Sequence, residues 1–145
     1  EEEKTAVDEA LTVLQEFVDL SNDVYSSGGE GADEFEKLAS DAVLFKAKQE
    51  AEQFSNDGIR MYGNYRLKDI GIHEVDLDRD DETQIPFVTI HSCVPVSEYS
   101  FSGSSPSSSP TSPPEFDTFG FVIADYDDSW YVSEQYLWTD GCELN

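Results

Sequence analysis

The chain has 145 residues, 38% hydrophobic and 12% aromatic, which suffices for one domain with a single core and not for a second domain. Its 32 acidic residues against 8 basic ones give a formal net charge of -24, which disfavours both nucleic-acid binding and electrostatic docking to a membrane. No apolar run approaches the ~20 residues that a membrane-spanning helix needs. The first residue is Glu rather than Met, so we expect a mature or trimmed chain.

The charge is unevenly distributed along the chain. From Asp80 to the end there is no Lys or Arg, whereas seven of the eight basic residues fall between Lys37 and Arg79. We interpret this acidity as the solvated surface of an exported or salt-exposed protein. A third hypothesis, suggested only by the charge, is that the chain is an acidic decoy that imitates DNA.

Helical periodicity dominates the first part of the chain. Apolar residues recur at spacings of three and four over residues 5–27, 32–40 and 43–55, which predicts three helices. Ser26 to Gly29 is expected to end the first helix, and Asn56 to Gly58 the third.

After Gly58 the period changes to two, which is typical of strands. Residues 59–77 are too long for one strand, so we expect a hairpin or a sharply bent pair, followed by a turn at DRDDET. Strands are predicted over 86–96, with His91 and Cys93 on one face, and over 116–126 and 129–138, which form a hairpin through Asp127-Asp128. The fold class is therefore α+β, with three N-terminal helices packed on one face of a curved antiparallel sheet of four to six strands.

Residues 102–114, SGSSPSSSPTSPP, contain no residue able to anchor a core. Because they lie between two predicted antiparallel strands, we expect a flexible hairpin tip extending into solvent from the single domain 1–145. A loop without a role is favoured over a glycosylated or partner-binding tip.

The two cysteines, Cys93 and Cys142, have no C-x-x-C spacing, and His73 and His91 have no metal-ligand spacing, so a zinc site is not expected. A catalytic thiol would need a nearby histidine. The simple alternative is a disulfide closing a loop of about 50 residues, which would indicate an oxidising compartment.

Several segments in this order resemble a known family. After the helices come, in order, GIRMYGNYRLKDIGIHEVDLD, VTIHSCVPVSE, a connection of variable length and SWYVSEQYLWTDGC. This order resembles the nuclear transport factor 2-like (ketosteroid isomerase-like) cone fold. More narrowly, the chain is similar to small exported lipoproteins and surface proteins of actinobacteria, of unknown function, that have this fold with one disulfide. The resemblance covers most of residues 5–142, although Val94-Pro95 stand where that group often has an acidic residue.

The resemblance implies a Cys93–Cys142 disulfide and a location on the extracellular face of the cell envelope, with any membrane attachment through a lipid anchor that this chain lacks. Dimers through the exposed sheet face are common in this fold. No reaction is implied, because the fold hosts isomerases, cyclases, dehydratases and inert binding domains.

Enzymes of this fold place a carboxylate base and hydroxyl donors in an apolar cavity. Tyr25, Tyr62, Tyr65 and His91 are the candidate ligand-binding residues, but none matches a catalytic motif, so no catalytic residue is assigned. A Tyr or His among aromatic neighbours is more often a core residue whose polar tip is satisfied.

The run DLDRDDE begins like a calcium loop, but Asp81 stands where the loop needs Gly and Phe87 where it needs Glu, so a solvated turn is favoured and no metal or cofactor is expected. The leading hypothesis is an exported, non-enzymatic envelope domain that binds a small apolar ligand or an envelope protein. The alternative is an isomerase- or cyclase-type enzyme, which a cavity lined by Tyr and an uncharged carboxyl would favour.

Overall fold

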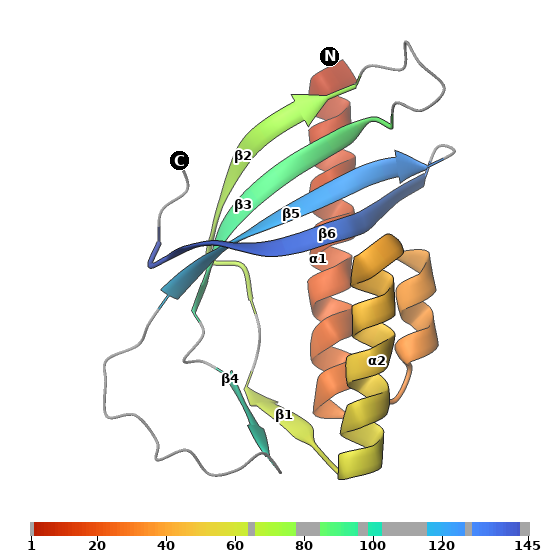
Figure 1. Ribbon diagram of the computed structural model, residues 1–145. Coiled ribbons are helices and arrows are strands. Elements are labelled where there is room, and N and C mark those ends of the chain that lie inside the picture. The colour runs from red at the N-terminus through yellow and green to blue at the C-terminus, as the bar shows by residue number, and fades with distance from the viewer. Residues whose placement is uncertain are drawn as a thin grey trace.

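The computed structural model describes residues 2–63, 66–77, 85–95, 99–102, 116–126 and 129–142. Helices pack on one face of a four-stranded antiparallel sheet, and a second, two-stranded sheet lies beside them (Figure 1). This arrangement confirms the predicted α+β class.

Three helices precede the first strand, and the second is shorter than predicted. Helix α1 (Glu2–Ser26) and helix α2 (Asp41–Asp57) are α-helices, whereas η1 (Ala32–Lys37) is a 3-10 helix that buries Phe35. Residues 38–40 do not continue the predicted helix, because they bond to Val132 of the last strand through the carbonyl of residue 38 and the amide of residue 40. No described helix has both the length and the apolar composition that crossing a membrane requires.

The segment predicted as a hairpin or a bent pair is a bent pair. Strand β1 (Arg60–Gly63) pairs with β4 (Tyr99–Ser102), whereas β2 (Asp69–Asp76) pairs with β3 (Phe87–Pro95). Gly63 has a φ of 84°, a conformation that glycine adopts without strain, and it lies where the chain leaves the small sheet for the large one. The hairpin alternative for residues 59–77 is therefore wrong.

The large sheet has the order β2-β3-β5-β6, with β5 at Phe116–Tyr126 and β6 at Ser129–Asp140. Tyr126 pairs with Ser129, which confirms the predicted β5–β6 hairpin, although its turn residues lie outside the described part of the chain. The predicted DRDDET turn, residues 78–83, likewise lies outside it.

The Ser/Pro-rich segment connects strands of different sheets. Ser102 ends β4 and Phe116 begins β5, and these two strands pair with β1 and β3 respectively. The predicted hairpin tip, apart from Ser102, lies outside the described residues.

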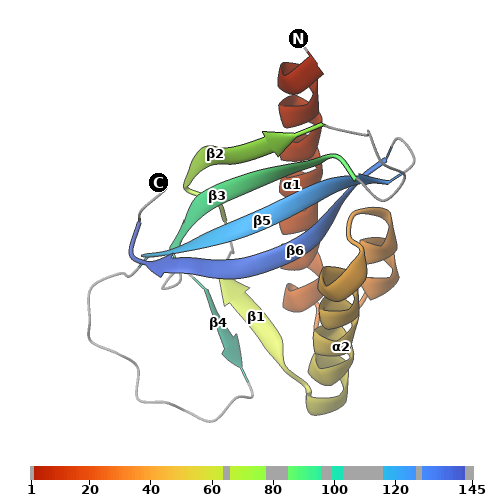
Figure 2. The same ribbon diagram turned by 45° about the horizontal axis from the view of Figure 1, so that its top comes forward.

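The core lies between the helices and one face of the large sheet. In both views α1 crosses behind that sheet, and α2 and η1 lie on the same side near β6 (Figures 1 and 2). The buried apolar side chains that form one cluster there are Ala6, Ala10, Leu14, Phe17, Val18, Val24, Phe35, Ala39, Val43, Ala47, Ala51, Val88, Ile90, Phe121, Ile123 and Val132. Among the described elements, none covers the opposite face of the large sheet, which we call the outer face.

Two hydrogen bonds fasten the helices to the sheet from outside the core. The indole Nε1 of Trp130 donates to Glu9 Oε2 at 2.7 Å, and the hydroxyl of Tyr126 donates to Asp41 Oδ2 at 2.6 Å. They hold α1 and α2 against the β5–β6 hairpin. The helices therefore fix the position of the sheet from the side opposite to the outer face.

Candidate functional site

The outer face is defined by the alternation of side chains along the strands. On β3, Val88 and Ile90 belong to the core cluster, so Thr89, His91 and Cys93 point the other way. The sequence prediction that His91 and Cys93 share a face is therefore confirmed.

One row of outer-face residues crosses all four strands. Strand pairing aligns Gly71 of β2, His91 of β3, Gly120 of β5 and Tyr136 of β6. A Cβ atom added to Gly120 would collide with the ring of Tyr136, so the end of that ring lies directly over the glycine. The glycine thereby lets the Tyr136 hydroxyl reach across β5 to His91 Nε2, at 3.1 Å.

Two bulges turn additional rings toward His91. His73 falls at the register shift between Ile72 and Glu74 of β2, and Trp138 is left between the paired residues Leu137 and Thr139 of β6. Bulges re-aim side chains and are frequent beside functional sites. Each bulge thus brings one further ring, His73 from β2 and Trp138 from β6, to the same central residue.

These four side chains form what we call the ring cluster: His73, His91, Tyr136 and Trp138. The His91 ring stacks on His73 with centroids 4.2 Å apart and lies 4.7 Å from Trp138, while His73 and Trp138 are 5.5 Å apart. Tyr136 meets His91 edge-on at 6.1 Å. His91 is consequently 0% exposed on a face that no described element covers, whereas Trp138 remains 43% exposed.

Two carboxylates lie in the next row of the outer face. Glu74 pairs with Thr89, Thr89 with Val122, and Val122 with Glu134, so the row has a glutamate at each end. Burial raises the pKa of the Tyr136 hydroxyl, and the negative charges of Glu134 and Glu74 raise it further. The Tyr136 hydroxyl therefore keeps its proton and lies within the field of both carboxylates.

The residues that the sequence singled out are not brought together. Tyr25 lies on the helix side, where its ring is 5.0 Å from that of Phe54 and its hydroxyl donates to Glu50 at 3.3 Å. Tyr62 on β1 is 59% exposed, and Tyr65 lies outside the described residues. Of the four candidates, His91 alone belongs to the ring cluster.

Burial raises the pKa of the Tyr25 hydroxyl, and the charge of Glu50 and its hydrogen bond raise it further. A phenol held in its neutral form can donate a hydrogen bond but is a poor base or nucleophile. Because its ring packs against the core at the end of α1, Tyr25 acts here as a core residue whose polar tip is satisfied.

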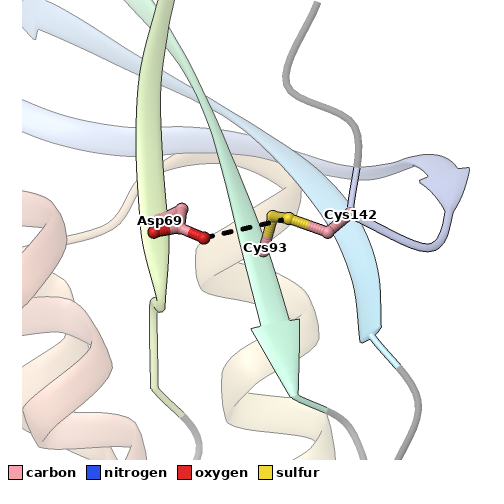
Figure 3. A group of neighbouring side chains, drawn as sticks. All are labelled: Asp69, Cys93 and Cys142. Atoms are coloured by element: carbon pink, nitrogen blue, oxygen red, sulfur yellow. Dashed lines mark hydrogen bonds between the residues drawn. A yellow bond between two sulfur atoms is a disulfide. The ribbon is translucent and has the colours of Figure 1, made fainter.

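The predicted disulfide between Cys93 and Cys142 is present, with Cα atoms 5.2 Å apart. It joins a central strand to the residues that follow β6, and Asp69 of β2 lies beside it (Figure 3). The dashed line in Figure 3 joins Asp69 Oδ2 to Cys142 Sγ at 4.0 Å. An oxidised sulfur has no proton to donate, so this is a charge–sulfur contact.

Asp69, Cys93 and Cys142 also form the one group of three metal-ligand side chains found in the described part of the chain. Metals bind the cysteine thiolate. Both sulfurs are committed to the disulfide, so this group does not offer a thiolate site while the bond exists. The calcium-loop segment that begins at Asp76 lies mostly outside the described residues.

Comparison with known proteins identifies the fold and no family. The sequence matches no family model, and no curated protein matches it. Among solved structures, the chain is similar to the intermembrane space region of the chloroplast protein ARC6, with a TM-score of 0.64 and 8% identity over 88% of this chain and 92% of that one. At this identity the likeness shows a shared fold and nothing about activity.

Proposed function

We propose that this chain is a non-enzymatic domain that works in an oxidising compartment outside the cytosol and binds an envelope protein through the outer face of its large sheet. The observation that carries the proposal is the ring cluster, in which two bulged edge strands bring rings onto a buried histidine on a face that none of the described elements covers.

Two observations support the compartment. The Cys93–Cys142 disulfide is of a kind that persists in oxidising environments. The structurally similar ARC6 region is described as the intermembrane space region of a chloroplast protein, a location consistent with one outside the cytosol. The narrower assignment, a surface lipoprotein of actinobacteria with the nuclear transport factor 2-like cone fold, rests on the sequence resemblance.

Protein binding is favoured over binding of a small apolar ligand inside the fold. The side of the sheet that faces the helices is occupied by the core cluster, whose large members Phe17, Phe35 and Phe121 are at most 6% exposed. On the outer face, by contrast, Trp138 and Tyr136 present aromatic surface with a polar tip, the kind of side chain that dominates binding energy at protein interfaces.

A photo-cross-linking comparison in the native host tests this function. A benzophenone amino acid replaces Trp138 in one variant and Phe45 in the other. Phe45 is the matched control because it is 69% exposed on α2, on the other side of the molecule. We expect a defined adduct with one envelope protein from position 138 and none from position 45.

The outcomes separate the alternatives. Adducts only from position 45, or from neither position, would contradict binding through the outer face. An adduct with a second copy of the chain would make the face a dimer interface, and an adduct with a small apolar molecule would replace the protein partner by a ligand.

A further inference from the structure

Resting on the proposed function, we infer that the partner segment that covers the outer face carries arginine side chains, whose guanidinium groups stack on the ring cluster and pair with Glu74 and Glu134. The charge of the sheet, the position of the two glutamates and the shape of the rings support this partner chemistry.

The large sheet contains no positive side chain. Strands β2, β3, β5 and β6 include no Lys or Arg, and strand pairing places four of their carboxylates on the outer face: Asp69, Glu74, Asp76 and Glu134. The nearest lysine in sequence, Lys68, lies 4.5 Å over the ring of Phe116, and two others pair with glutamates of η1. The charge on this face is therefore not neutralised by the strands that form it.

Glu74 and Glu134 lie on opposite edge strands, in the row of side chains next to that of the rings. Neighbouring strands are about 4.8 Å apart, so three spacings separate the backbones of these residues by about 14 Å. The charges of both carboxylates nevertheless act on the Tyr136 hydroxyl. One guanidinium is too small to bond to both carboxylates, so we expect at least two arginines in the partner segment.

Arginine fits this surface better than lysine. Its guanidinium is planar, stacks on aromatic faces and bonds to a carboxylate through two parallel N–H groups, whereas the lysine ammonium is compact and strongly hydrated. The rings of Trp138 and Tyr136, with the carboxylates of Glu74 and Glu134 in the neighbouring row, offer both kinds of contact.

A second copy of the chain is a poor occupant. Pairing two outer faces would bring two sets of the same carboxylates together, on chains that each carry a net charge of -24. Like charges across an interface oppose association, whereas opposite charges favour it. The charge therefore favours a basic partner over self-association.

A peptide titration of the full 15N-labelled chain tests the inference. The probe is a short acetylated and amidated Gly/Ser peptide with two arginines, and the control peptide has citrulline in their place, which keeps the shape and removes the charge. The readout is the indole N–H resonance of Trp138. Trp130, whose Nε1 donates to Glu9 on the helix side, is the internal reference.

We expect the arginine peptide to shift the Trp138 resonance saturably, to leave that of Trp130 unchanged and to bind about tenfold more tightly than the citrulline peptide. The double variant Glu74→Gln with Glu134→Gln should weaken binding about tenfold, because each exposed ion pair contributes a modest amount. Equal affinities of the two peptides would overturn the inference.

A charge-matched variant separates a local site from general attraction to an acidic chain. Glu16→Gln with Glu52→Gln removes the same two charges from exposed positions of α1 and α2. We expect this variant to retain affinity within about twofold, because charges beyond the screening length contribute little. A loss equal to that of the Glu74/Glu134 variant would overturn the inference.

The two proposals fail in different ways. If cross-linking from position 138 identifies a protein partner while the arginine peptide leaves the Trp138 resonance unmoved, the arginine inference is wrong and the proposed function stands. If the chain sediments as a dimer in which Trp138 is protected, a second copy occupies the face and both proposals are wrong.

Discussion

Reduction of the disulfide is the perturbation whose effect on stability can be worked out most directly. Cys93 and Cys142 are 49 positions apart in the sequence. Closing a loop of about 50 residues lowers the entropy of the denatured chain by about 14 cal/mol/K, or about 4 kcal/mol at 25 °C. Because a domain of this kind is stable by only about 5–15 kcal/mol, reduction should remove a large part of the free energy of unfolding.

Urea unfolding of the unmodified chain, with and without a reductant that contains no thiol, measures this effect without a substitution. For a slope of about 2 kcal/mol/M, the midpoint should fall by about 2 M. The slope should also rise, since the reduced denatured chain exposes more surface. A loss below about 1 kcal/mol with an unchanged slope would refute the reasoning, because the denatured chain would then not be restrained by the bond.

Three further predictions concern single residues. Gly120→Ala should lower the free energy of unfolding, measured with urea, by about 1–3 kcal/mol, because the new Cβ atom collides with Tyr136; in a Tyr136→Ala background the loss should be much smaller. Equal losses in the two backgrounds would contradict the close packing of Tyr136 over Gly120. Asp69→Asn should speed reduction of the disulfide by a small anionic thiol about fivefold, because the Asp69 carboxylate, 4.0 Å from Cys142 Sγ, repels the attacking thiolate. An unchanged rate of reduction in a stopped-flow assay would exclude this role of Asp69. Above pH 10 the free energy of unfolding should fall, because tyrosines ionise in the denatured chain while the raised pKa of Tyr25 keeps this residue neutral in the folded chain. The Tyr25→Phe variant should show a shallower fall, and a pH profile identical to that of the unmodified chain would contradict this role of Tyr25.

The sequence predicted the helices and most strands because their signals are local. The apolar spacing in residues 5–27 and 43–55 matches α1 and α2, and the alternation in residues 86–96 matches β3. The second helix was predicted too long, since the hydrogen bonds that end it are made to Val132, far along the chain. Long-range partners of this kind leave no local pattern.

The ring cluster could be predicted only in part, for a similar reason. Alternation places His91 on the correct face, and a Cys93–Cys142 disulfide is both the simple alternative for two cysteines and what the resemblance implies. His73 and Trp138 join the cluster through bulges, which shift side-chain positions by one residue without a distinct composition. A glycine at position 120, in the middle of a strand, was the one available signal, because strand glycines often mark a close approach.

The central claim is that the outer face is open in the isolated chain and covered by a partner in the native setting. The test is hydroxyl-radical footprinting of two samples, the purified chain and the intact envelope of the source cell. In each sample the oxidation of Trp138 is compared with that of Phe45. The account predicts that Trp138 is modified in the purified chain and protected in the envelope, while Phe45 is modified equally in both. Protection of Trp138 in the purified, monomeric chain, or its full modification in the envelope, would contradict the account.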